Sequence, residues 1–178
     1  MSRDQRIQAA LDKFGKYLVQ QARSNLTKQN KNVSKGLYDS IQWNAKASKS
    51  GDSFSASLSM LPYGEFQDKG VKGKEGTPKG AQNSPFKFGS GKSGNKGGLT
   101  EAINKWVKAR RFQFRDKKGK FMSYDSTAFL ISRSIYRKGI PASFFYSQPF
   151  KLGFQKLPSE IVEAFRLTED DLKAFTRK

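Results

Sequence analysis

Hydrophobic side chains recur at helical spacing near the start of the chain. Steps of three or four residues separate six apolar positions: Ile7, Leu11, Phe14, Leu18, Ala22 and Leu26. Because positions with this spacing fall on one face of a helix, the pattern predicts an amphipathic helix over roughly residues 3–27, with Lys, Arg and Gln on the opposite face. Gly15 lies inside this segment, and glycine is a poor helix former, so we expect it to weaken the helix locally.

The period then changes from helical to alternating. Four apolar side chains alternate with serines at the positions Phe54, Ala56, Leu58 and Met60, which is typical of a half-buried strand. Residues 42–47 alternate in the same way, and the Lys-Ser-Gly-Asp sequence at 49–52 has turn chemistry. The two segments therefore predict a β-hairpin.

The second half of the chain mixes helical segments with one aromatic run. A short helix is predicted from Leu99 with Thr100 as its cap, and a longer one over residues 126–138, stopped by Gly139. Residues 143–150 are rich in aromatics and predict a strand, with Pro149 placing its end at a sheet edge. Residues 159–178 predict a C-terminal helical segment. The expected fold is α+β in one domain over residues 1–178: amphipathic helices packed on a small antiparallel β-sheet, with a long Gly/Lys-rich loop.

That loop spans residues 70–98 and contains nine glycines, six lysines and one acid, Glu75. Loops of this length are uncommon in compact domains unless they are functional or disordered. We therefore expect a flexible arm, anchored by Phe86 and Phe88, that becomes ordered against another molecule, so that the protein works by assembly. Residues 89–93 read Gly-Ser-Gly-Lys-Ser, but a phosphate-binding loop needs glycine where Phe86 stands, so nucleotide binding is not expected.

Charge is strongly unbalanced, with 34 Lys and Arg against 15 Asp and Glu, a net charge of +19. This balance favours attraction to polyanions. Residues 105–120 hold eight basic residues and one acid, interleaved with aromatics, a pattern that single-stranded nucleic-acid binding requires. The competing interpretation, which we favour, is a hairpin with its turn at residues 116–119. Its phenylalanines pack inward while the charges stay solvated: Phe112, Phe114 and Phe121.

Catalytic chemistry has little support in the composition. The chain contains no His and no Cys, which removes the commonest general base, the commonest metal ligand and any disulfide. A carboxylate site for a metal-dependent nuclease remains an alternative, built from sparse acids: Glu65, Asp68, Glu101 and Asp125. We expect no catalytic residues, no cofactor and no metal. The absence of a long apolar run predicts a soluble protein made in the cytoplasm.

Three short motifs occur in a characteristic order along most of the chain. They are Gly-Leu-Tyr-Asp-Ser-Ile at 36–41, Pro-Tyr-Gly-Glu-Phe-Gln-Asp-Lys-Gly at 62–70 and Gln-Pro-Phe at 148–150. This order, between a long first helix and a variable loop, resembles the tail-completion or head–tail joining proteins of tailed bacteriophages. An Asp-Lys-Gly stands where that family usually has Phe-Gly-Thr, and the basic insert around residues 110–120 is additional. The resemblance implies an α+β fold and a ring in the neck (the head–tail connector) or tail of the virion.

The resemblance and the residue patterns together assign two groups of candidate contacts. We expect an assembly interface at Tyr63, Glu65, Phe66, Phe86, Phe88, Phe145 and Phe150, and contacts to DNA or to acidic partners at Arg110, Arg111, Arg115, Lys117 and Lys118. The expected partners are other copies of the chain, the portal, adaptor or tail-tube proteins, and DNA bound by non-specific electrostatics. No membrane partner is expected.

Overall fold

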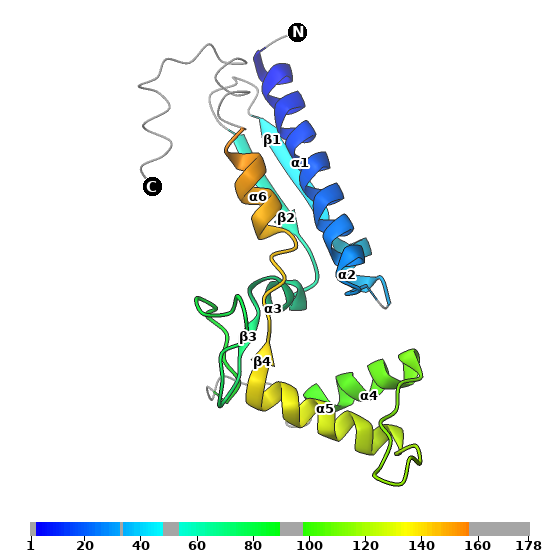
Figure 1. Cartoon of the computed structure of the whole chain (residues 1–178). Helices are drawn as coiled ribbons and strands as arrows, with labels where there is room; N and C mark the ends of the chain where they lie inside the picture. The colour runs from blue at the N-terminus through cyan, green and yellow to red at the C-terminus, as the bar shows by residue number, and fades with distance from the viewer. Residues whose placement is uncertain (1–2, 33, 48–53, 90–97, 157–178) are drawn as a thin grey trace. The chain divides into compact units, whose positions relative to one another are not determined.

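A computed structural model describes residues 3–32, 34–47, 54–89 and 98–156 of the chain (Figure 1). These residues form two compact units. Unit 1 combines the chain up to Leu61 with the part from Phe145 onward, and unit 2 is Pro62–Phe144. The fold class is mixed α+β, with helices and two small two-stranded antiparallel sheets among the described residues, as the sequence predicted. The expectation of a single domain stays a prediction.

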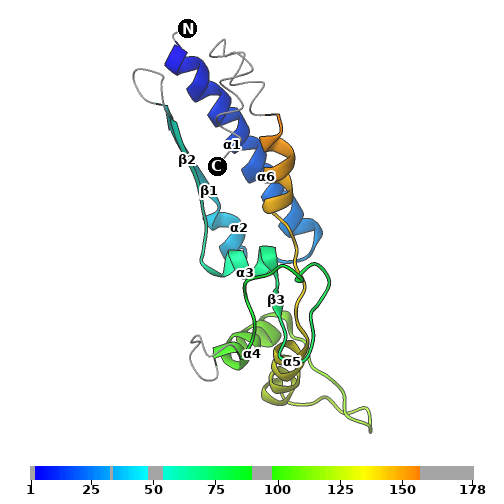
Figure 2. The same ribbon diagram turned by 90° about the vertical axis from the view of Figure 1, so that its left-hand side faces the viewer.

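Unit 1 is a long helix packed on a hairpin (Figures 1 and 2). Helix α1 (Arg3–Lys28) confirms the first predicted helix, and β1 (Gln42–Ala47) pairs antiparallel with β2 (Phe54–Ser59), with Trp43 opposite Leu58. The apolar face of α1 is buried, as its spacing requires. One cluster joins four residues of α1 to the apolar face of the hairpin: Ile7, Leu11, Phe14 and Leu18 against Trp43, Ala45, Phe54 and Leu58.

Gly15 has a packing role that could not be predicted from its low helix propensity. A Cβ atom at this position would overlap the indole ring of Trp43 on β1. The glycine therefore costs helix stability locally, but it lets α1 and the hairpin approach closely around the largest side chain between them. Phe14 completes this contact by meeting Trp43 edge to face, with ring centroids 5.3 Å apart.

The second core cluster of unit 1 covers the C-terminal half of α1. It contains five buried residues, Ala22, Leu26, Leu37, Ile41 and Phe145. Leu37 comes from the short helix α2 (Gly36–Ser40), and Phe145 comes from the far end of the sequence. The Asn25 amide donates to the Phe145 carbonyl at 3.1 Å, so the chain is fixed to α1 where it returns to unit 1.

The predicted strand at residues 143–150 was wrong. The segment turns at Phe145 and Tyr146 and continues as helix α6 (Ser147–Phe154), which lies beside α1. Pro149 falls in the first turn of this helix, where a backbone N–H has no intrahelical partner, so the proline costs nothing there. Gly153 keeps α6 close to α1, since a Cβ there would lie 2.8 Å from Phe14 Cε2.

Unit 2 contains a pair of helices and a minimal sheet. Helices α4 (Gly98–Arg110) and α5 (Tyr124–Lys138) pack on each other, and β3 (Val71–Lys72) pairs antiparallel with β4 (Gly139–Ile140). The Ser123 hydroxyl caps α5 by accepting from the Ser126 N–H at 3.1 Å. Gly139 ends α5 as predicted, with φ of 90° that favours glycine. Thr100 lies within α4 and does not cap it.

Residues 70–89 of the predicted arm were also assigned wrongly, because they are tied to unit 2 by backbone hydrogen bonds. The Lys72 N–H donates to the Phe86 carbonyl and the Phe88 N–H to the Lys72 carbonyl, both at 2.9 Å. The N–H groups of Lys74 and Glu75 bond the last carbonyls of α5, which otherwise have no partners within the helix. Two small side chains, Ala81 and Ser84, are buried. Residues 90–97 lie outside the described residues.

The predicted C-terminal helical segment at 159–178 lies beyond the described residues as well. Of the helices that the structure describes, none combines the length and the apolar character needed to cross a membrane.

Candidate functional surfaces

Unit 2 places many of its large apolar side chains on its surface. In its described part the buried hydrophobic residues are small, namely Val71, Ala81, Val107 and Ala128. The other buried side chains of that part are polar: Asp68, Ser84, Thr127 and Ser132. Ten large apolar residues of the same part are exposed: Tyr63, Phe66, Trp106, Phe112, Phe114, Phe121, Phe129, Leu130, Tyr136 and Phe144. Exposed apolar surface of this extent marks interaction sites in natural proteins.

Helix α3 (Tyr63–Lys69) carries three of the predicted interface residues, Tyr63, Glu65 and Phe66. Tyr63 and Phe66 are exposed, and the ring of Phe66 meets Phe86 edge to face with centroids 4.5 Å apart. The Lys69 ammonium lies 3.4 Å from a Glu65 carboxylate oxygen and 6.0 Å from the centre of the Phe86 ring. Glu65, Phe66 and Phe86 are therefore brought together around Lys69 on the surface of unit 2, and Tyr63 is exposed on the same helix.

The other predicted interface residues are dispersed. Phe88 packs on Tyr136 of α5, with ring centroids 5.8 Å apart. Phe150 lies in unit 1, where it stacks on Phe154 of α6 with the rings 14° from parallel, and it is exposed. Phe145 has no exposed surface. It is a core residue of unit 1, so in this conformation it contacts no other molecule.

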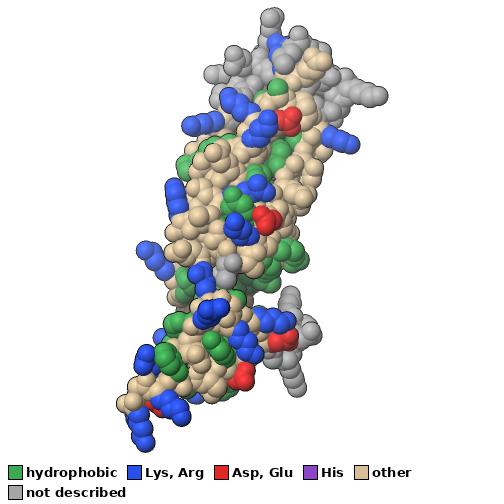
Figure 3. Space-filling view, turned by 90° about the vertical axis from the view of Figure 1, so that its right-hand side faces the viewer, with side chains coloured by type: hydrophobic (Ala, Val, Ile, Leu, Met, Phe, Trp, Pro, Cys, Tyr) green, Lys and Arg blue, Asp and Glu red, His purple; other side chains and the backbone are tan. Residues whose placement is uncertain are grey.

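The predicted cationic contacts lie on the connection between α4 and α5. We call residues 105–121 the basic tip. Figure 3 shows Lys and Arg side chains spread over the whole of this face, with hydrophobic side chains among them at its lower end. Five cations predicted as contacts are all exposed: Arg110, Arg111, Arg115, Lys117 and Lys118.

Hydrogen bonds shape the basic tip. One Asp116 carboxylate oxygen accepts from the Lys118 and Lys120 N–H groups at 2.9 Å, and the Gly119 N–H donates to the Asp116 carbonyl. A bridge between Arg115 and Phe121 confirms the predicted turn. The predicted inward packing was wrong, since the three phenylalanines of the tip are exposed. The described residues of α4 and α5 that are buried instead are smaller: Val107, Thr127, Ala128 and Ser132.

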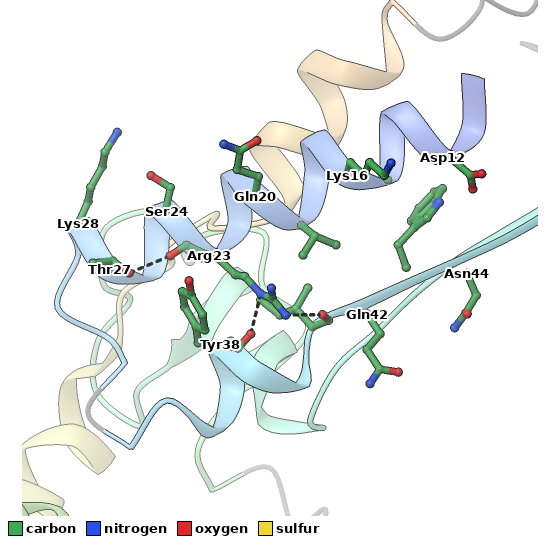
Figure 4. A pocket seen from close by; sticks show the side chains of 14 residues that line it. Asp12, Lys16, Gln20, Arg23, Ser24, Thr27, Lys28, Tyr38, Gln42 and Asn44 are labelled. Atoms are coloured by element: carbon green, nitrogen blue, oxygen red, sulfur yellow. Dashed lines mark hydrogen bonds between the residues drawn. The ribbon is translucent and has the colours of Figure 1, made fainter. Parts of the chain in front are cut away.

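A groove in unit 1 runs between α1 and β1, with a volume of about 980 Å³. Figure 4 shows Arg23 reaching from α1 to the carbonyls of Tyr38 and Ile41, at 3.0 and 3.3 Å. Val19, Ile41 and Trp43 are apolar residues of its lining. Among the described residues that line the groove, Asp12 is the one carboxylate, so these residues offer no second acid for a pair of acid–base groups.

The carboxylates considered for a metal site are engaged elsewhere. Glu65 pairs with Lys69, Glu101 with Lys105 at 2.9 Å, and Asp125 accepts from the Asn104 amide, while Asp68 is fully buried. The hydrogen bond and charge of Lys105 lower the pKa of Glu101. Burial lowers the pKa of Lys31. No group of three or more acidic residues within the described ranges is arranged to hold a metal ion.

Several surface residues were missed by the sequence reasoning. Phe129 and Tyr136 of α5 were not among the predicted contact residues, but they are exposed, while Ala128 and Ser132 of the same helix are buried. The missed signal is that apolar residues occupy two faces of this helix, more than one packed partner needs.

Similar proteins were sought among family models, curated proteins and solved structures, and none of the three comparisons gives a match to this chain.

Proposed function

We propose that this chain is a non-enzymatic structural protein of a tailed-phage virion, forming an oligomeric ring in the neck or tail through which DNA passes. One observation carries the proposal: within its described residues, unit 2 buries small or polar side chains and exposes ten large apolar ones. A surface of this kind is completed by other molecules, since aromatic and Arg side chains are enriched where proteins bind each other.

The resemblance of the sequence motifs to tail-completion or head–tail joining proteins supports the proposal that the assembly is a ring in a phage neck or tail. In this protein residues 36–41 form helix α2 and lead into the hairpin, and residues 62–70 contain the exposed surface of α3. Identical subunits that contact each other head to tail form a closed ring when the rotation between them closes. Portal, adaptor or tail-tube proteins are the further partners that this proposal implies.

The self-assembly part of the proposal is tested by the mass and the shape of the purified protein. Multi-angle light scattering should give a uniform multiple of the subunit mass, and negative-stain images should show rings. Phe66→Ser should lower the mass, because it removes an exposed aromatic from the α3 surface. Ser57→Ala on the exposed part of β2 is the matched control and should leave the mass unchanged. A monomer at every accessible protein and salt concentration would contradict self-assembly.

A nuclease is the enzymatic rival, with Glu65 and Asp68 as its candidate acids. Plasmid and single-stranded DNA incubated with the protein in Mg²⁺ or Mn²⁺ should remain intact. Cleavage that disappears in the Glu65→Gln variant would replace the structural proposal with an enzymatic one.

A further inference from the structure

The basic tip presents aromatic rings and cations together. Its three phenylalanines are 41%, 37% and 56% exposed at Phe112, Phe114 and Phe121. Eight basic residues and one acid lie between residues 105 and 120. Exposed rings are unfavourable in water unless a partner covers them, and exposed cations attract a polyanion, so one partner should satisfy both features.

Hydrogen bonds fix the backbone of the segments that carry these rings. The Phe112 N–H donates to the Val107 carbonyl at 2.9 Å, and the Met122 N–H donates to the Phe114 carbonyl at 2.9 Å. The Gln113 amide also donates to the Met122 carbonyl, at 2.7 Å. Because these bonds fix the backbone on both sides of the tip, a ligand would find the aromatic positions already formed.

The rings of the basic tip contact one another and a cation but remain partly exposed. Phe112 meets Phe114 at 77° with centroids 5.3 Å apart, and Trp106 lies 6.2 Å from Phe112. On the other side of the turn, the Arg115 guanidinium lies 4.0 Å from the centre of the Phe121 ring. Neither of these ring pairs is parallel-stacked, and the guanidinium lies over one face of Phe121, so a flat ligand would stack on the ring faces that these contacts leave uncovered.

Among polyanions, one class uses both features of this surface. Duplex DNA offers phosphates but keeps its bases stacked inside, and an acidic polypeptide offers charge with no array of flat rings. Single-stranded nucleic acid offers phosphates for the cations and unpaired bases for the rings. We propose that the basic tip is a binding site for single-stranded DNA or RNA that stacks bases on Phe112, Phe114 and Phe121. This goes beyond ring assembly and does not depend on it.

The test measures the affinity of the full-length protein for fluorescently labelled oligothymidylate by anisotropy. Replacing Phe112 or Phe121 with Leu, which keeps an apolar side chain but removes the ring, should weaken binding by about 5- to 100-fold. Phe129→Leu is the matched control, because Phe129 and Phe121 are both 56% exposed and Phe129 lies outside the tip. The control should change the affinity less than about two-fold, within the usual small effect of surface substitutions. Light scattering on each variant ensures that proteins of the same oligomeric state are compared.

Two further arms separate stacking from charge alone. Converting Arg110, Arg111, Lys117 and Lys118 to Gln should flatten the salt dependence of binding, because each phosphate that is no longer neutralised reduces the log–log slope by about 0.7 for single strands. A duplex of the same length should bind more weakly and should not respond to Phe121→Leu. Equal affinity for duplex and single strand without any response to the Phe variants would overturn the proposal. Tighter, ring-dependent binding of polyglutamate would overturn it too and would assign the tip to an acidic protein.

Discussion

The two units of this protein distribute their side chains in opposite ways. Among the described residues, unit 1 buries nine hydrophobic ones, most of them large, and its core clusters lie where the periodicity of α1 places them. The described part of unit 2 buries four small hydrophobic residues and four polar ones, and exposes twice as many large apolar side chains as that of unit 1. A core stabilises a fold in proportion to the apolar area that it removes from water. We therefore expect unit 1 to be stable by itself and unit 2 to gain stability when a partner covers its exposed apolar side chains.

The largest expected effect tests this contrast with one kind of substitution in both units. Leu18→Ala removes a side chain that has no exposed surface in unit 1, and should lower the free energy of unfolding by about 2–5 kcal/mol. Leu130→Ala on the exposed face of α5 should change it by about 0.5 kcal/mol or less. Urea titrations followed by circular dichroism measure both, at concentrations where all variants have the same mass. Equal losses would show that unit 2 also depends on its large residues for its own stability.

A second pair of variants compares glycines in the helices of the two units. Helix propensity alone favours alanine over glycine by about 1 kcal/mol. Gly15→Ala should nevertheless destabilise unit 1 by about 1–3 kcal/mol, because the new methyl group overlaps the Trp43 ring. Gly98→Ala in α4 meets nothing within 4 Å and should be neutral or stabilising. Thermal melting of the two variants shows whether each substitution lowers or raises the stability of the protein. A stabilising Gly15→Ala would show that the indole moves aside without cost.

The third prediction concerns local order in unit 2, where packing contributes little. Ser123→Ala removes the hydroxyl that caps α5 and should cost about 1 kcal/mol. Ser134→Ala, also on α5 but exposed and away from the cap, is the control and should cost nothing. Amide hydrogen exchange should accelerate in the first turn of α5 only for the cap variant. Unchanged exchange there would mean that contacts with α4 hold the turn without the cap.

The smallest effect is expected for the surface ion pair of unit 2. The Arg137 Nε atom lies 2.7 Å from a Glu75 carboxylate oxygen, with both side chains about half exposed. Exposed pairs contribute about 0.2–1 kcal/mol, so Glu75→Gln should lower stability by no more than this, and the loss should vanish at high salt. Glu101→Gln, which removes a still more exposed pair with Lys105, should have a smaller effect. A larger, salt-independent loss for Glu75 would assign a structural role to residues 74–75 at the end of α5.

How far the sequence predicted the structure depends on which principle governed each segment. The alternation at residues 54–60 predicted a strand and the spacing from Ile7 to Leu26 predicted a helix, each with one apolar face. Both predictions were confirmed by β2 and α1, whose apolar faces pack together. The aromatic run at 143–150 was predicted to be a strand because aromatic residues favour strands, and Pro149 was interpreted as the end of that strand at the edge of a sheet. Proline is equally compatible with the first turn of a helix. The segment forms helix α6, which is stabilised by contacts with α1 such as that between Phe150 and Phe14.

The candidate surfaces were predicted in part. Charge and aromatic content located the basic tip and the α3 surface, because cations and their spacing are visible in the sequence. Whether each aromatic faces inward was not predictable. Phe145 was assigned to an interface and is buried, while Phe112, Phe114 and Phe121 were assigned to a core and are exposed. Each outcome depends on how much space the neighbouring elements leave, which is a property of the tertiary structure.

By itself the sequence determined the local elements that have a clear period, the basic character of residues 105–120 and the absence of His and Cys chemistry. Tertiary structure alone decided that Gly15 accommodates Trp43, that residues 70–89 bond to β3 and to the end of α5, and that unit 2 turns its large side chains outward. The physical reason is that periodicity records which face of an element is apolar. Packing and backbone hydrogen bonding between elements distant in sequence then determine what covers that face.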